Sequence, residues 1–294
     1  MREGPLTQLL VERFETMPSQ LKLAARFVLD HPQEVALISM REQAQRAGVS
    51  HSTMMRLARW LGLEAYEDMR ALYAQALREP GAKSAAKPAE AVETPSVAED
   101  GQGYSTVSAT TDMLAAQVAR LGEYTSAMQH VAVADILIGA RRVYCLGLRS
   151  EQVVATHFSR LFSLFDDRGT LLDAAAKGEV DALRHAGPGD VMLVVGMAPY
   201  ARATVEVARR AAKRGVTIVA ITDSRVSPLA RLARASVIVT VESHSFFRSV
   251  TPALAAAEIL IALIAQRSGV DVKEAMRAVE QHLSEYDVYW TPSR

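Results

Sequence analysis

The chain contains little cysteine, few aromatic residues, no excess of one charge and no long apolar run. One cysteine among 294 residues excludes an internal disulfide, and the apolar run around Cys145 indicates a buried thiol in a reducing compartment. Lysine plus arginine number 33 and aspartate plus glutamate also number 33, so the chain as a whole lacks the basic excess of many nucleic-acid binders. A charged partner would therefore have to meet a local patch.

Apolar segments fall short of the ~18 uninterrupted residues that a membrane span needs. The longest candidate, residues 253–265, carries Glu258 and indicates a buried helix. The N-terminal sequence mixes acids and Arg13 with its apolar residues, unlike a secretory signal. We therefore expect a soluble, cytoplasmic protein with no membrane partner, long enough for two domains.

Two short helical patterns separated by a turn occupy residues 39–60. Apolar residues at helical spacing end at Gly48, the residue type best able to leave a helix through a left-handed turn. Ser50 can then cap a second helix, whose apolar face comprises Met54, Leu57, Ala58 and Leu61. This order predicts a helix-turn-helix, whose second helix enters the major groove of double-stranded DNA.

The other side of this motif is polar and basic. Between residues 41 and 59, four arginines stand against the single acid Glu42, a local net charge of +3. The side chains that we expect to contact DNA are Arg41, Ser50, His51, Ser52, Thr53, Arg56 and Arg59. Flanking patterns, including a helix over residues 19–29 that Pro32 stops, extend an all-α domain of about five helices over residues 1–78.

Residues 79–105 are rich in Pro, Gly, Ala and charge without apolar periodicity, which predicts a flexible linker. The second domain, residues 106–294, opens with two helical patterns and then alternates apolar β-branched runs with helices. These runs lie at residues 143–147, 191–196, 216–222 and 237–241, with a weaker one at 170–172. Fully apolar strands separated by helices predict an α/β domain with a doubly wound parallel sheet covered on both faces.

Ligands of doubly wound sheets bind where strands end and helices begin. The turn from Gly147 to Ser150 lacks the GxGxxG spacing of a dinucleotide site but offers a hydroxyl, a guanidinium and a helix N-terminus, which together favour an anion. Serine before a helix is more often only a cap. The residues that we expect at a ligand site are Gly147, Arg149, Ser150, Tyr200, Arg202 and Thr204, although Arg202 is equally well explained as a solvated side chain.

Other polar segments carry weaker signals. Ser227-Pro228 indicates a helix start, and residues 242–249 form either a binding loop or a surface connection. His157, His185 and Glu258 are not spaced for a metal, and neither a nucleophile elbow nor a Walker loop occurs. We therefore predict no catalytic residues, no metal, no cofactor and no enzymatic reaction.

The two halves together resemble the RpiR/MurR-type bacterial transcription regulators, which join a helix-turn-helix to a sugar isomerase (SIS) domain. The first half is similar in MPSQLKLAARFVLDHPQEVALIS and AGVSHSTMMRLARWLGLEAYEDMR, and the second in RVYCLGLRSEQVVA and GDVMLVVGMAPYARATVEVARRAAKRGVTIVAITDSRVSPLA. The resemblance implies a homodimer or homotetramer on a palindromic operator, controlled by a sugar phosphate or related effector. Residues matching the family's recognition helix and first ligand turn are Ser50, Ser52, Thr53, Arg56, Gly147 and Ser150.

The second ligand turn departs from the family pattern. Phosphosugar-binding SIS domains usually have a serine-rich loop there, whereas this chain has Gly196-Met197-Ala198-Pro199-Tyr200. Two alternatives to a ligand-controlled regulator stay open. One is a phosphosugar isomerase using Glu206, Glu242 or His244 as its base, and the other is a regulator whose SIS domain only forms oligomers.

Overall fold

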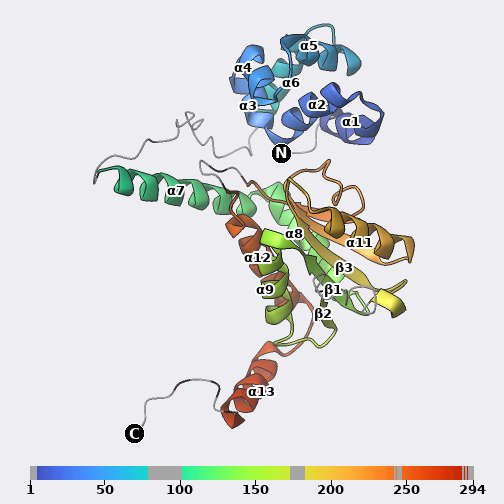
Figure 1. Cartoon of the computed structure of the whole chain (residues 1–294), viewed down its shortest axis with the longest axis vertical. Helices are drawn as coiled ribbons and strands as arrows, with labels where there is room; N and C mark the ends of the chain where they lie inside the picture. Colours follow the sequence, from blue (N-terminus) through green and yellow to red (C-terminus); the bar gives the residue numbers. More distant parts are fainter. Residues whose placement is uncertain are drawn as a thin grey trace. The chain divides into compact units, whose positions relative to one another are not determined.

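The computed structural model describes residues 5–78, 101–172, 183–241, 243, 247–286, 288 and 290 (Figure 1). These residues divide into two compact units, one formed mainly by residues before 117 and the other mainly by residues after 116. Each unit has its own hydrophobic core. Two separate cores agree with the two kinds of apolar periodicity in the sequence.

The first unit is helical throughout its described residues. Up to residue 78 its α-helices are α1 (Pro5–Arg13), α2 (Ser19–Asp30), α3 (Pro32–Leu37), α4 (Met40–Arg46), α5 (His51–Trp60) and α6 (Tyr66–Arg78). Val28, Leu57 and Met69 on three of these helices are completely buried. The prediction of five helices is wrong because Pro32 does end α2 but also occupies the first position of α3, where the missing proline N–H costs nothing.

The predicted linker is only partly described. Residues 79–100 lie outside the described residues, whereas residues 101–105, expected as linker, belong to α7 (Gly101–Ala119). Helix α8 (Tyr124–Ile138) follows, as the second helical pattern predicted. The linker prediction is therefore wrong at its C-terminal end.

The described part of the second unit contains a five-stranded sheet. Its strands are β1 (Val143–Gly147), β2 (Gly169–Leu171), β3 (Val191–Gly196), β4 (Thr217–Thr222) and β5 (Ala235–Ile238). They pair in the order β2-β1-β3-β4-β5, all parallel. The register aligns Gly147 with Val195 and Gly196 with Thr222, so the ends of β1, β3 and β4 meet at one edge. This confirms the predicted parallel α/β fold.

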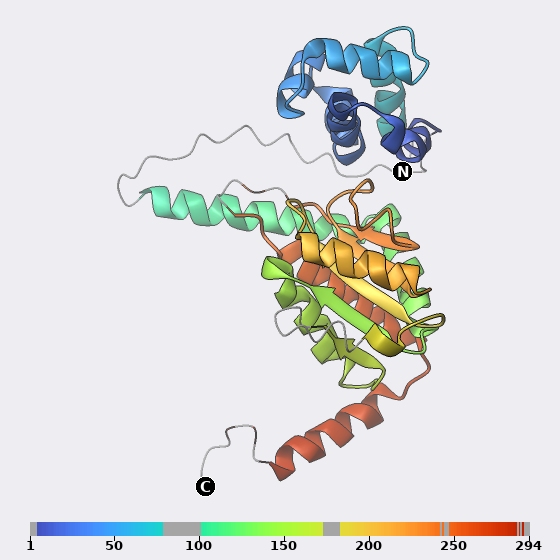
Figure 2. The same ribbon diagram turned by 45° about the vertical axis from the view of Figure 1, so that its right-hand side comes forward.

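Helices cover both faces of the sheet (Figures 1 and 2). Cys145 packs into the core formed with α8, α9 (Gln152–Phe162) and α12 (Thr251–Arg267), while its neighbour Leu146 packs on the side of α11 (Arg202–Lys213). This alternation follows from the two-residue period of a strand. Cys145 is completely buried, which confirms the expected buried thiol, and burial raises its pKa to about 12.

Two further segments bear on the predictions. Ser227 accepts a hydrogen bond from the amide of Ala230 over 2.9 Å, as a cap does, but turns follow it and the predicted helix is wrong. Helix α13 (Val272–Glu285) comes after α12. No single helix among the described residues is long and apolar enough to cross a membrane; α12 and α13 pass that test only as a pair, with a bend of 113°.

Candidate functional site

The turn between α4 and α5 is fixed by the backbone. Gly48 has a φ of +65°, and the amide of Val49 donates to the carbonyl oxygen of Ala44 over 2.9 Å, a bond that closes the end of α4. The hydroxyl of Ser50 accepts from the amide of Thr53 over 3.2 Å and caps α5. Helix, left-handed glycine and serine cap occur in the predicted order, which confirms the helix-turn-helix.

A buried glutamine joins this motif to its neighbours. The side-chain amide of Gln43, which is completely buried, donates to the carbonyl oxygens of Val35 over 3.1 Å and Ile38 over 2.9 Å. Its oxygen accepts from the hydroxyl of Tyr66, whose pKa is raised by burial so that the proton is retained. Gln43 thus ties α4 to α3 and α6 through a fully satisfied polar contact.

The side of α5 opposite the core presents polar and basic groups. Met54, Leu57 and Ala58 are completely buried, which confirms the predicted apolar face. Exposed residues of the predicted set are Arg41, Ser50, His51, Ser52, Arg56 and Arg59. Met55, 37% exposed, lies on the same side of the helix and was not predicted. Within the part of the chain that the structure describes, neither Arg56 nor Arg59 has an acidic partner.

The structure contradicts the expected exposure of Thr53 and shows that one of the four arginines is paired with acids. Thr53 is only 2% exposed, and its hydroxyl receives a hydrogen bond of 3.2 Å from Nη2 of Arg56, so it positions that arginine instead of reaching DNA. Arg46 pairs with Glu34 at 2.9 Å and with Glu42 at 2.7 Å. The local charge of +3 therefore overstates the free charge, because Glu34 lies outside the counted stretch.

The β1–α9 turn carries the first set of predicted ligand residues. A Cβ atom on Gly147 would lie 2.4 Å from the carbonyl oxygen of Glu151, so only glycine fits at this strand exit. Arg149 follows with a φ of +60° and is exposed. The side chain of Ser150, also exposed, caps neither the short 3₁₀ helix Arg149–Glu151 nor α9, so the cap interpretation is wrong. The hydroxyl remains accessible to a ligand.

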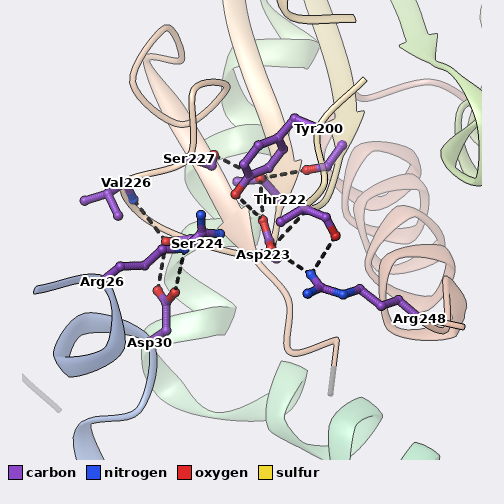
Figure 3. A network of polar contacts seen from close by, with 11 residues as sticks. Arg26, Asp30, Tyr200, Thr222, Asp223, Ser224, Val226, Ser227 and Arg248 are labelled. Carbon is purple, nitrogen blue, oxygen red and sulfur yellow. Dashed lines mark hydrogen bonds and ion pairs between the residues drawn. The ribbon is translucent and has the colours of Figure 1, made fainter. Parts of the chain in front are cut away.

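The β3–α11 turn carries the second set and is organised by an aspartate. Asp223, directly after β4, accepts hydrogen bonds from the hydroxyl of Tyr200 over 2.7 Å and from the amide of Ala198 over 3.1 Å (Figure 3). Arg202 is exposed and pairs with Glu206 at 2.7 Å, which favours the solvated interpretation. Thr204 is only 2% exposed, so its prediction as a ligand contact is wrong.

Three residues at this edge were missed as site residues. Nη1 of Arg248 donates to the carbonyl oxygen of Ala198 over 2.6 Å and lies 3.8 Å from Asp223 (Figure 3). Burial raises the pKa of Glu151, and the nearby negative charge of Asp223 adds to that rise. Two carboxyl groups, Glu151 and Asp223, therefore lie close enough to influence each other.

A shallow hollow of about 510 Å³ runs along α9. Its lining residues are Arg149, Gln152, Val153, Thr156, His157 and Arg160, of which only Arg149 belongs to the predicted site. Nε2 of His157 lies 2.9 Å from Glu258, so this histidine is a satisfied surface residue. The described residues contain no cluster of His, Cys, Asp or Glu able to hold a metal ion.

A helix-turn-helix unit and a parallel α/β unit with polar groups at its strand ends define the class of two-domain transcription regulators. Comparison with known families agrees in both halves. Residues 4–80 match the helix-turn-helix domain of the rpiR family, and residues 136–263 match the SIS domain. The chain therefore belongs to the RpiR family of helix-turn-helix regulators with a SIS domain.

Individual relatives support this assignment. The HTH-type transcriptional regulator HexR of Pseudomonas aeruginosa is 25% identical over 291 residues, 95% of each chain. The sugar isomerase domain of an RpiR transcription factor from Sphaerobacter thermophilus is 26% identical, with a TM-score of 0.55, over 61% of this chain and 98% of that one. Vibrio vulnificus NanR, complexed with ManNAc-6P, shares the fold at 17% identity and a TM-score of 0.56, over 96% and 98%. Other structures with the SIS fold carry names of sugar-phosphate isomerases, so the fold alone does not separate regulator from enzyme.

Proposed function

We propose that this protein is a cytoplasmic transcription regulator whose DNA binding is modulated by a small ligand at the carboxyl edge of the SIS sheet. The observation that carries the proposal is the outer face of α5, where Arg56 and Arg59 are exposed without an acidic partner among the described residues. The buried face of the same helix holds it in place. A rigid helix with free cations suits the major groove of DNA.

Contacts with DNA divide between phosphates and bases. Ser52 and Arg56 near the start of α5 are the candidates for base edges, while Arg41 and Arg59 meet phosphates. We propose a homodimer or homotetramer in which two copies of α5 read half-sites about 10 base pairs apart, so the operator is palindromic.

Binding of the effector takes place beside the β1–α9 turn. The exposed Ser150 hydroxyl and Arg149 guanidinium are free to meet a carbohydrate derivative there. If the ligand binds one arrangement of the two units more tightly, it changes the affinity for DNA, and DNA changes the affinity for the ligand by the same factor. The regulation is allosteric only if both affinities change in this reciprocal way.

The test of DNA binding is a fluorescence-anisotropy titration of the full chain onto the DNA upstream of its own gene at several salt concentrations. We expect preference over random duplex of about a thousandfold or more, and an affinity that falls linearly with salt on logarithmic axes. Equal affinity for random DNA would reject the proposal.

A second candidate function is sugar-phosphate isomerisation, which needs a carboxyl group able to exchange protons. Glu151 favours it, because its pKa is raised and it lies at the ligand edge. Glu206 does not, because its ion pair with Arg202 lowers its pKa. Glu242 and His244 lie outside the described residues. If the wild type isomerises a hexose phosphate and Glu151→Gln does not, the protein is an enzyme and not a regulator that only senses its ligand.

A further inference from the structure

The β3–α11 turn, residues 196–201, already contains an anion supplied by the chain. The carboxylate of Asp223 accepts from the backbone amide of Ala198 and from the hydroxyl of Tyr200, over 3.1 and 2.7 Å (Figure 3). Thr222 adds a longer contact of 3.4 Å to the same carboxylate. Two donors of this turn, the Ala198 amide and the Tyr200 hydroxyl, therefore converge on an internal carboxylate.

An anion from outside would need those same donors. Backbone amides at the end of a parallel strand are the groups that bind a phosphate at the edge of such a sheet. In residues 196–201 Tyr200 supplies the only side-chain hydroxyl, and it donates to Asp223. A phosphate entering here would have to displace the carboxylate from both donors.

The arginine beside the turn is already engaged by groups of the chain. Nη1 of Arg248 donates to the carbonyl oxygen of Ala198 over 2.6 Å and forms a longer ion pair of 3.8 Å with Asp223. The carboxyl group of Glu151 is a second acid, near enough to Asp223 for that charge to raise the Glu151 pKa. A dianionic phosphate would thus meet two carboxyl groups, and juxtaposed like charges disfavour binding.

We propose that Asp223 excludes phosphate from the β3–α11 turn, and that the effector meets this turn with hydrogen-bond donors, as an unphosphorylated sugar or amino sugar would. Ionised carboxylates only accept hydrogen bonds, so hydroxyl and ammonium groups are their natural partners. The inference rests on the proposed function, since it names the ligand class of the same site.

Inorganic phosphate is the direct probe of the exclusion. Its binding to the full chain is measured by calorimetry and by thermal unfolding at constant ionic strength, in the wild type, Asp223→Asn and the control Glu280→Gln, which removes an exposed carboxylate from α13. Asparagine keeps the size of the side chain but not its charge. We expect Asp223→Asn to bind phosphate about tenfold or more tightly than the wild type, since removal of one like charge is worth at least that much, and the control to match the wild type.

Three outcomes would overturn the exclusion: phosphate binding by the wild type as tight as by Asp223→Asn, binding by neither protein, or an equal gain in Glu280→Gln. The ligand class is tested with hexoses, amino sugars and their 6-phosphates on the wild type. Binding by an unphosphorylated member, and weaker binding of its 6-phosphate, is expected. Failure of every unphosphorylated sugar, or preference for a 6-phosphate, rejects the class. DNA titrations of the same proteins without ligand separate these results from the proposed function, because Asp223→Asn should bind DNA like the wild type.

Discussion

The outer face of α5 and the carboxyl edge of the sheet both carry arginines, but the two regions use them differently. On α5, Arg56 and Arg59 point outward with no acid beside them in the described residues. At the sheet edge, Arg202 pairs with Glu206 at 2.7 Å and Arg248 lies 3.8 Å from Asp223. Free cations suit a polyanion such as DNA, whereas an edge on which Arg149 is exposed but Arg202 and Arg248 are paired with acids suits a small polar ligand.

The same contrast occurs inside the helix-turn-helix. Arg46 is held by Glu34 and Glu42, while Arg56, ten positions later, contacts only the hydroxyl of Thr53 among the polar groups described. Counting arginines in the sequence therefore gives the total charge of a surface but not the part that a partner can use. Substitutions that change one region at a time therefore separate the two.

The largest effect is expected for Gly147→Ala, which alters the SIS unit alone. The new Cβ would lie 2.4 Å from a backbone oxygen, so the turn must shift. We expect a loss of about 3 kcal/mol in the free energy of unfolding, at the upper end of overpacking costs. Urea unfolding followed by circular dichroism measures it, with Gly122→Ala as the control because a Cβ there meets nothing within 4 Å. Equal stability of the two variants would show that the strand exit is not as tight as described.

The next effect, confined to the helix-turn-helix unit, is expected for Gln43→Leu. The substitution leaves two carbonyl oxygens and the Tyr66 hydroxyl without their partner, which costs about 2 kcal/mol. Denaturant unfolding measures the loss, and Gln45→Leu on the exposed side of α4 is the matched control. A variant as stable as the control would mean that water replaces the glutamine and that the contact is dispensable.

The smallest effect is a pH dependence in the SIS unit. Burial alone would raise the pKa of Asp190, but hydrogen bonds from Arg141 and from the amide of Gly187 hold it below its usual value. A carboxyl group whose pKa is lower in the folded than in the unfolded state stabilises the fold at pH values above the unfolded pKa of about 3.9. This stabilisation is lost as the pH falls from that value through the lower pKa of the folded state. In Arg141→Met we expect acid unfolding to begin at higher pH than in the wild type. Identical acid limbs would remove the role assigned to this ion pair.

Residues that form the fold were easier to predict than residues that form the site. The observed limits of β1 and β3 are those expected, because both strands are apolar β-branched runs buried on two faces. Hydroxyls were harder: Thr53 and Thr204 were expected outside and are buried. A threonine near the start of a helix can direct its hydroxyl to solvent or to the neighbouring turn. The spacing of apolar residues is the same in both cases, so it did not distinguish them.

The organisation of the ligand edge could not be read from sequence spacing. Asp223 contacts Ala198 across 25 positions, and Arg248 contacts the same residue across 50. Parallel topology brings their loops together, and the sequence predicted that topology, but the choice of partner among several polar loop residues depends on backbone direction at each strand end. The missing serines of residues 196–200 were the one visible sign that this turn differs from a phosphate-binding loop.

The difference between free and paired arginines is tested most directly by salt-dependent DNA binding of the wild type, Arg56→Ala and Arg46→Ala on the DNA upstream of the gene. We predict that Arg56→Ala loses about 1–3 kcal/mol of binding free energy if it reads a base, or about one unit of the salt slope if it meets a phosphate. Arg46→Ala should keep the salt slope of the wild type and lose less affinity than Arg56→Ala, since its guanidinium is already paired with Glu34 and Glu42. An Arg56→Ala protein that binds like the wild type, or an Arg46→Ala protein that loses as much as Arg56→Ala, would contradict the account.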